Sequence, residues 1–204
     1  MLPLTLDLSR LRVILVGEGE AALRRLALLD DAGAGALTVH AETPSAALVA
    51  AAGRRLVRRL PDAAELAATR LVFLSERDAP YCAALATAAR AAGALVHVED
   101  APMLGDVQAP AVMRRGDLTI AVSTGGKSPG LAALVKRFLA QRFGAEWQEH
   151  LDALAARRRG WRASGADAST IARWSEAWVA RQGWLPAETT SSAAVTRPHL
   201  VAGQ

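Results

Sequence analysis

The chain has 204 residues, of which 51% are hydrophobic and 22% charged, and its net charge is +4. This composition excludes wholesale disorder, a collagen-like fibre and a small fold held by disulfides. The single cysteine, Cys82, can form neither an internal disulfide nor a tetrahedral cysteine site for zinc, so the reducing cytoplasm is the expected location. We expect neither a signal peptide nor a membrane-spanning helix.

Short apolar runs alternate with stretches of helical periodicity through the first hundred residues. Most of the runs are rich in Val, Leu and Ile and have the length of a buried parallel strand. The alternation predicts the α/β class, a Rossmann-like parallel sheet with helices on both faces and right-handed crossovers. The predicted strands are 12–16, 37–41, 54–59, 71–75 and 95–98, and the predicted helices are 21–32 and 79–92.

The pattern changes after residue 100. Residues 101–117 contain several prolines and glycines and are predicted as a loop, followed by a strand at 118–122. Ser128 and Pro129 are typical of a helix N-cap and of the first helical position. The sequence therefore predicts a short strand followed by a helix in this segment.

All five tryptophans lie beyond residue 145, in a stretch predicted to be helical. Ile171, Trp174 and Trp178 fall on one stripe of a helix, which indicates a small helical bundle with tryptophan in its core. A platform on which nucleic-acid bases stack is the disfavoured alternative.

A glycine-rich turn, Gly17-Glu-Gly-Glu-Ala-Ala22, stands directly after the first predicted strand and before the first helix. It matches the G-x-G-x-x-A pattern of dinucleotide-binding domains, in which Gly17 permits the tight turn, Gly19 lets a pyrophosphate approach and Ala22 lets the helix pack closely. The helix N-terminus offers N–H groups and a positive dipole end to the phosphates. The alternative is a glycine-rich turn in an unrelated α/β domain.

An acidic residue that binds the adenosine ribose is expected about twenty residues after such a turn, at the end of the second strand. Glu42 stands at that distance, beside Thr43, and the alternative is a solvated loop glutamate. No basic residue occupies 41–45, where a 2′-phosphate would need one, which favours NAD over NADP.

A second glycine-rich segment resembles the end of a P-loop. The first glycine of that motif would fall on Ala121, so a nucleotide kinase or NTP hydrolase is disfavoured. The loop can still bind an anion such as a substrate carboxylate, through Gly125, Gly126, Lys127 and Ser128.

Asp100 directly follows the fifth predicted strand, at the sheet edge where ligands of parallel sheets bind. A carboxylate there can accept a proton or stabilise a developing cation, which makes Asp100 the candidate catalytic residue. The alternative is an aspartate that caps a turn or a helix. The four histidines lack the spacing of metal ligands, so we predict no resident metal.

Three blocks of the sequence resemble the precorrin-2 dehydrogenase family, which forms the dehydrogenase and ferrochelatase half of sirohaem synthases. The first block runs from Leu4 through the glycine turn to Arg25, and the second comprises 97–100 and 109–116. The third, Leu118-Thr-Ile-Ala-Val-Ser-Thr-Gly-Gly-Lys-Ser-Pro129, is the most specific. The resemblance covers about residues 2–145.

The resemblance implies a homodimer that oxidises precorrin-2 to sirohydrochlorin and passes a hydride to NAD+. Some family members also insert Fe2+ or Co2+ into the product. The resemblance assigns catalysis to Asp100 and cofactor contacts to Glu20, Ala21, Glu42 and Thr43. The predicted domains are a NAD-binding Rossmann domain at 1–112, a dimerisation segment at 113–145, a helical region at 146–186 and a flexible tail at 187–204.

The sequence departs from the family pattern at two places. Glu18 stands where members often have glycine, a change expected to matter little because this position does not contact the pyrophosphate. Residues 102–109 lack the aromatic residue that is usual there. A serine of the central loop that is modified in some relatives is Thr124 here, and Thr124 is a candidate substrate-binding residue.

The implied substrate carries many carboxylates, which a mildly basic protein would attract. Arg114, Arg115 and Lys127 are the candidate cations near the predicted cleft, and we expect no nucleic-acid or membrane partner. Two other functions stay open, an NAD-sensing regulatory Rossmann module and a tetrapyrrole carrier without redox activity. The regulatory module would not need an aspartate at position 100, and the carrier would bind the tetrapyrrole without reducing NAD+.

Overall fold

The computed structural model describes residues 2–76 and 80–185. The chain forms two compact units, Met1–Met113 with Ile120–Leu139, and Arg114–Thr119 with Ala140–Gln204. The predicted flexible tail at 187–204 lies outside the described residues. The predicted domain limits therefore remain predictions.

The first unit is built on five parallel strands, β1 (Arg12–Val16), β2 (Ala36–His40), β3 (Leu56–Val57), β4 (Leu71–Leu74) and β5 (Leu95–Val98). They lie in the order β3-β2-β1-β4-β5, which confirms the predicted Rossmann-like sheet. The register pairs Val16 with both His40 and Leu74, and Leu74 with Val98. The carboxyl ends of four strands therefore meet at one edge, and the direction of strand addition reverses between β1 and β4.

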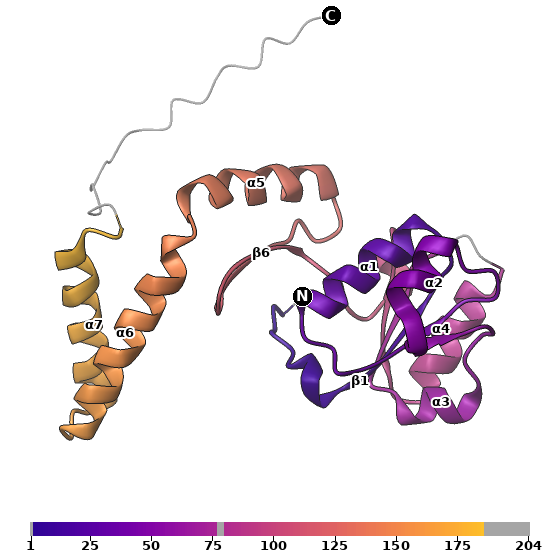
Figure 1. Cartoon of the computed structure of the whole chain (residues 1–204), viewed down its shortest axis with the longest axis horizontal. Helices are drawn as coiled ribbons and strands as arrows, with labels where there is room; N and C mark the ends of the chain where they lie inside the picture. Colours follow the sequence, from indigo (N-terminus) through magenta and orange to yellow (C-terminus); the bar gives the residue numbers. More distant parts are fainter. Residues whose placement is uncertain (1, 77–79, 186–204) are drawn as a thin grey trace, which may run out of the picture. The chain divides into compact units, whose positions relative to one another are not determined.

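Helices cover both faces of this sheet (Figure 1). The first face packs against α1 (Glu20–Asp31) and α2 (Ala46–Ala52), and the second against α3 (Ala63–Ala68) and α4 (Cys82–Ala91). Side chains alternate along β1, so that Val13 and Leu15 face the first pair of helices while Ile14 and Val16 face the second. This apolar packing holds the strand ends, and the loops that follow them, in place.

The short helices α2 and α3 were not predicted from the sequence. They have seven and six residues, too few to show a clear helical periodicity. Their N-terminal caps are visible in the structure, since the Ser45 hydroxyl accepts a hydrogen bond from the N–H of Leu48. Asp62 and Glu65 form a reciprocal capping box at the start of α3.

Two predictions from the sequence, one of a strand and one of a loop, need correction. Strand β3 is shorter than the predicted 54–59, because Arg54 and Arg55 belong to a turn of 3-10 helix. Residues 101–117 are not all loop, since they contain a short 3-10 helix, η3 (Pro102–Leu104), and the strand β6 (Ala111–Arg115). Strand β6 pairs with β7 (Leu118–Val122) across a two-residue turn in which Gly116 has a φ of 56°. Flanking prolines and glycines concealed this strand.

The second unit consists mainly of α6 (Glu146–Ala163) and α7 (Ala168–Gln182), which pack as a helical hairpin. Ile171 and Trp178 are buried, but Trp174 is 43% exposed, so the predicted tryptophan stripe is only partly a core. The exposed ring still packs edge to face on Trp161, with centroids 5.7 Å apart. The preceding helix, α5 (Pro129–Arg142), crosses from the first unit into the second. Among the described residues, no helix is long and apolar enough to cross a membrane.

Candidate functional site

The glycine turn lies between β1 and α1, where the strand order reverses. Gly17 has a φ of +153°, and a Cβ at this position would lie 3.1 Å from the Cβ atoms of both Ala22 and Ser75. The N–H of Gly17 donates to the carbonyl of His40 at 3.1 Å, which ties the turn to the end of β2. Gly17 and Ala22 therefore pack as the motif requires, with no room for a larger residue.

Gly19 is the N-cap of α1, and Glu20 and Ala21 begin its first turn. The first N–H groups of an α-helix have no acceptor within the helix and attract anions. A Cβ on Gly19 would meet only Glu76 Oε1, at 4.0 Å, so no other group crowds the start of this helix. An open helix N-terminus at the switch point of a parallel sheet fits the pyrophosphate of a dinucleotide.

A carboxylate that was not predicted from the sequence contacts this turn. Glu76, just after β4, accepts hydrogen bonds at Oε1 from the N–H groups of Glu18 at 2.5 Å and Gly19 at 3.1 Å. Burial and the nearby charges of Glu76 and Glu18 raise the pKa of Tyr81, whose protonated hydroxyl donates to Glu76 Oε2 at 3.4 Å. The turn therefore already binds a negatively charged oxygen, as a nest of N–H groups does.

Glu42 and Thr43 are the two residues predicted to contact the ribose, and their N–H groups donate hydrogen bonds to the side chain of Glu18. Glu18 Oε1 accepts from the N–H of Glu42 at 3.0 Å and of Thr43 at 2.8 Å. The Thr43 hydroxyl donates to Glu18 Oε2. These hydrogen bonds, those from Thr43 above all, hold the pKa of Glu18 below its usual value, so this carboxylate is ionised at neutral pH.

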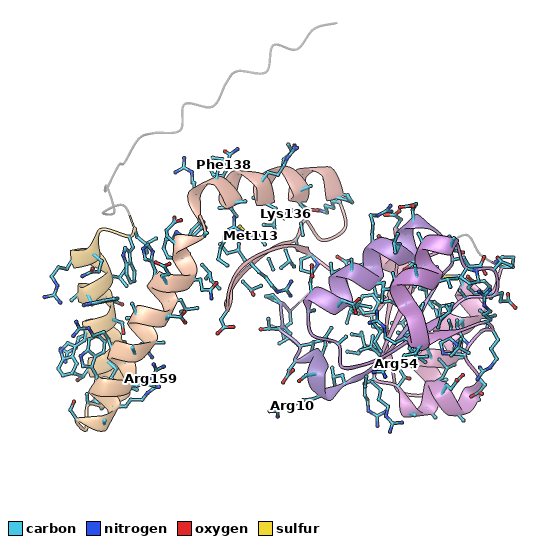
Figure 2. The ribbon with its side chains drawn as sticks, in the orientation of Figure 1. Arg10, Arg54, Met113, Lys136, Phe138 and Arg159 are labelled. Carbon is cyan, nitrogen blue, oxygen red and sulfur yellow. The ribbon has the colours of Figure 1, made fainter. Side chains whose placement is uncertain are left out.

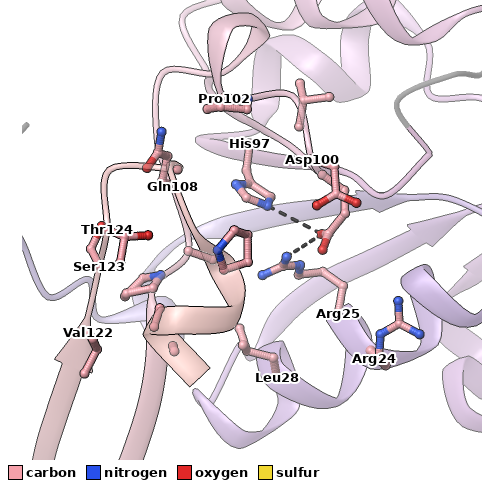
Figure 3. Close-up of a pocket in the computed structure, with 18 of the residues that line it drawn as sticks. Arg24, Arg25, Leu28, His97, Asp100, Pro102, Gln108, Val122, Ser123 and Thr124 are labelled. Atoms are coloured by element: carbon pink, nitrogen blue, oxygen red, sulfur yellow. Dashed lines mark hydrogen bonds and ion pairs between the residues drawn. The ribbon is translucent and has the colours of Figure 1, made fainter. Parts of the chain in front are cut away.

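A cavity of about 440 Å³ opens in the first unit beside the ends of β5 and β7 (Figure 3). It brings together residues that are far apart in the sequence, Ala21 of α1, Asp100 after β5, and Thr124 and Gly126 after β7. Its polar lining also includes Arg24, Arg25, His97, Glu99, Gln108 and Ser123. The candidate catalytic residue and part of the candidate anion-binding loop thus share one cavity.

The rest of the predicted loop does not line this cavity. Lys127 and Ser128 shape the loop instead, since the N–H of Lys127 donates to the Thr124 carbonyl at 3.2 Å and Ser128 Oγ accepts from the N–H of Leu131. Gly125 has a φ of 63°, which serves the turn. The roles of these three residues in substrate binding stay predictions.

Asp100 has an unusual backbone conformation. Its φ is +51°, and within 2–76 and 80–185 no other residue except glycine has a positive φ. The left-handed region costs energy for residues with a Cβ, least of all for Asp and Asn, and such strain is concentrated at functional sites. The conformation presents an exposed carboxylate at the wall of the cavity.

Beside Asp100, an ionic group lines the cavity. Glu99 Oε2 pairs with Arg25 Nη2, and His97 Nε2 lies 3.6 Å from the same oxygen (Figure 3). His97 and Arg25 hold the pKa of Glu99 down to about 2, and Arg25, only 10% exposed, is the one in hydrogen-bond contact. Among the described residues, Arg25 Nε and His97 Nε2 are buried polar atoms without a hydrogen-bond partner.

The low pKa of Glu99 predicts how the free energy of unfolding depends on pH. Its value of about 2 in the folded chain lies below the 4.5 of an ordinary glutamate, so ionised Glu99 stabilises the fold above about pH 4.5. That contribution is lost as the pH falls from about 4.5 towards 2. Replacing Glu99 with Gln should lower the free energy of unfolding by about 2 kcal/mol at pH 7 and flatten its decline below pH 5, measured by urea unfolding.

The variant Glu149→Gln, exposed on α6, gives the background effect of removing one surface carboxylate. If Glu99→Gln and the native chain lost stability in parallel between pH 5 and pH 3, the role assigned to this ion pair would be wrong.

The candidate cations Arg114 and Arg115 belong to the second unit and do not line the cavity. The Arg115 guanidinium donates to the carbonyls of Phe143 at 2.8 Å and Ala140 at 3.2 Å, near the end of α5, where carbonyls lack partners within the helix. The cations of the cavity are instead Arg24 and Arg25. A signal for them exists in the sequence, because they follow Ala21 by one helical turn and so share its face.

No group of three or more His, Cys, Asp or Glu side chains that could hold a metal ion occurs in the described part of the chain.

The fold is that of a Rossmann-type dinucleotide-binding domain, with a glycine turn before α1 at the switch point of the sheet and a polar cavity adjoining the same helix. Comparison with known proteins agrees. The chain belongs to the family described as "Putative NAD(P)-binding", whose model matches residues 4–111. The model described as "Sirohaem biosynthesis protein central" matches residues 115–142.

Similar curated proteins are bacterial sirohaem synthases. That of Methylococcus capsulatus is 44% identical over 134 residues, which cover 64% of this chain and 28% of the relative. That of Pseudomonas putida strain W619 is 41% identical over 160 residues, covering 78% and 34%. The chain thus spans about a third of the length of these relatives. The solved structure of SirC, a precorrin-2 dehydrogenase, matches with a TM-score of 0.71 and 25% identity over 91% of this chain and 93% of that one.

Proposed function

We propose that the chain is a precorrin-2 dehydrogenase, which oxidises precorrin-2 to sirohydrochlorin with NAD+ as the hydride acceptor. One observation carries the proposal: Ala21, at the start of the dinucleotide-binding helix, and Asp100 line the same cavity. A similar tetrapyrrole dehydrogenase shares the fold over nearly its whole length. The nicotinamide supplies the acceptor for the hydride that leaves the tetrapyrrole.

The side chains of the cavity have distinct roles in this proposal. Arg24 and Arg25 bind substrate carboxylates, and the pairing of Arg25 with Glu99 holds its guanidinium in place. Asp100 accepts the ring proton that is lost together with the hydride, so that the substrate loses two hydrogens in all. The protein contributes chiefly by binding and orientation, because the redox chemistry belongs to the cofactor.

We also propose NAD rather than NADP as the cofactor, and a cytoplasmic location. The cofactor choice is supported by the absence of Lys and Arg from 41–45, and the location by the use of a single cysteine.

The test is the absorbance of NADH when the protein is mixed with NAD+ and precorrin-2. The expected result is one NADH formed per sirohydrochlorin. A flat trace with authentic substrate overturns the proposal, and binding measurements then separate the alternatives. Tetrapyrrole binding without NADH formation would indicate a carrier, and dinucleotide binding alone would indicate a regulatory module.

Insertion of Fe2+ or Co2+ into sirohydrochlorin is the second reaction that the family resemblance implies. The metal would be a substrate, and it would displace protons from pyrrole nitrogens that Asp100 could accept. Rates of Fe2+ insertion with and without the protein decide whether this activity accompanies the first.

We further propose that the chain forms a homodimer through α5. The helix exposes a stripe of large apolar side chains, with Leu131 51%, Leu134 54% and Phe138 53% exposed. Figure 2 shows Phe138 and Lys136 on opposite sides of this helix. An exposed apolar stripe of this kind marks a contact surface.

The dimer proposal predicts the effect of one substitution. Leu134→Glu places a charge inside the stripe and should weaken dimerisation by about 30-fold or more, measured by sedimentation velocity over a concentration series. The control Ala133→Glu adds the same charge to an exposed position on the other side of α5 and should leave the dimer intact. A native chain that sediments as a monomer at every concentration, or equal weakening by both variants, would contradict the proposal.

A further inference from the structure

Glu18 belongs to the glycine turn, and its side chain contacts the segment that follows β2. It is half-buried, and its carboxylate accepts three hydrogen bonds, from the N–H groups of Glu42 and Thr43 and from the Thr43 hydroxyl. Its backbone is held from the same segment, since the N–H of Ser45 donates to the Glu18 carbonyl at 3.1 Å. The carboxylate therefore has a defined position, directly at the end of β2.

In dinucleotide-binding domains this position binds part of the cofactor. The adenosine ribose lies at the end of the second strand, where an acidic side chain accepts hydrogen bonds from its hydroxyls. In this chain Glu42 occupies the expected sequence position, but the carboxylate that the structure fixes there is that of Glu18. An ionised carboxylate accepts about four hydrogen bonds, and Glu42 and Thr43 donate three to Glu18. The carboxylate can therefore still accept a hydrogen bond from a ribose hydroxyl.

The same charge opposes a 2′-phosphate. NADP carries that group on the hydroxyl that NAD offers as a donor, and recognition of it needs a cation nearby. The segment 41–45 supplies none, and Glu76, a further acidic group at the turn, accepts from the N–H of Glu18 itself. A 2′-phosphate at the end of β2 would thus meet a fixed negative charge that no cation of this segment balances.

We propose that Glu18 is the residue by which this site binds the adenosine ribose and selects NAD over NADP, and that Thr43 positions its carboxylate. The inference rests on the proposed dinucleotide site and deepens it. Glu18 thus has a role in specificity at a position that was expected to matter little because it does not contact the pyrophosphate.

The experiment is a titration of the full chain with NAD+ and with NADP+ by calorimetry. The native chain should prefer NAD+ by about 100-fold or more. Glu18→Gln keeps the size of the side chain and one acceptor oxygen but removes the charge, so it should bind NADP+ about 10-fold more tightly and lower the preference for NAD+ by about the same factor. The matched control Asp31→Asn removes an exposed carboxylate at the far end of α1 and should keep the preference within about twofold of the native value. Glu42→Gln tests the residue that the sequence position favours, and its preference should stay well above that of Glu18→Gln.

A second measurement does not depend on whether a variant folds. NAD+ that lacks the 2′-hydroxyl of its adenosine ribose should bind the native chain about 10-fold more weakly than NAD+, because Glu18 loses a donor.

Thr43→Val releases one oxygen of the Glu18 carboxylate and should reduce this discrimination between the two forms of NAD+. Its binding of intact NAD+ should weaken less.

The possible failures are distinguishable. A native chain that binds neither dinucleotide overturns the proposed function, and this inference with it. A native chain that binds NAD+ selectively, with a preference that Glu42→Gln abolishes or that Glu18→Gln leaves unchanged, overturns only the role of Glu18. Equal binding of NAD+ and of the form without the 2′-hydroxyl does the same.

Discussion

Gly19→Asp should weaken the binding of NAD+ by about 100-fold or more while the chain stays folded. Gly19 is the N-cap of α1, with φ −100° and ψ −155°, a conformation open to any residue. Asp is a strong N-cap residue, because its carboxylate accepts hydrogen bonds from N–H groups of the first helical turn. Those N–H groups are the ones offered to the pyrophosphate, so the new carboxylate both occupies them and repels the ligand.

This substitution changes ligand binding without unfolding the chain, because Asp at the N-cap stabilises the helix while it blocks the binding of anions there. The unfolding temperature should stay within a few degrees of the native value, since Asp and Gly at an N-cap differ by only a few tenths of a kcal/mol. Gly19→Asn provides the matched control with the same cap and no charge, and it should lose much less affinity. Calorimetric titration with NAD+ measures all three proteins. An Asp variant that binds NAD+ as tightly as the Asn variant would place the pyrophosphate elsewhere.

Asp100→Asn should lower the turnover of precorrin-2 by about 100-fold to 10,000-fold, with the affinity for NAD+ changed by less than about twofold. The amide cannot accept the proton that the substrate loses. Asn is the informative substitution because Asp100 has a φ of +51°, a conformation that Asn adopts at least as readily as Asp. Asp100→Ala removes the same group but adds about 1 kcal/mol of backbone strain, so its loss of turnover includes a structural part.

Turnover and binding must be measured on the same preparations. Single-turnover formation of NADH reports the chemical step, and calorimetry reports the affinity for NAD+. The control Asp31→Asn removes an exposed carboxylate from the end of α1 and should leave both unchanged. Equal losses of turnover and affinity in Asp100→Asn would show that Asp100 supports the structure of the crevice and takes no proton.

Apolar runs with a clear end predicted strands accurately, whereas other short elements left no clear pattern in the sequence. Strands β1, β5 and β7 have the predicted bounds, because each is an apolar run that ends at a turn residue or a charge. Strand β6 was not predicted because prolines and glycines flank it, and the short helices α2 and α3 were not predicted because six or seven residues show too little helical periodicity.

The amino-acid sequence by itself determined the α/β class, the glycine turn before α1 and the acid after β5. These are local features, which follow from the spacing of neighbouring residues and the conformational preferences of glycine. The parallel arrangement of the strands then brings every strand end to one edge, so even the approximate place of the site follows from chain order.

Only the tertiary structure decided which side chains meet at that edge. Thr43 binds Glu18 across 25 residues, Glu76 reaches the N–H of Glu18 across 58, and Arg25 pairs with Glu99 across 74. The cations of the cavity proved to be Arg24 and Arg25 of α1, and the carboxylate at the end of β2 proved to be that of Glu18. Spacing along the chain cannot reveal such contacts, because they depend on the register of strands and the packing of helices, which bring together side chains from elements far apart in sequence.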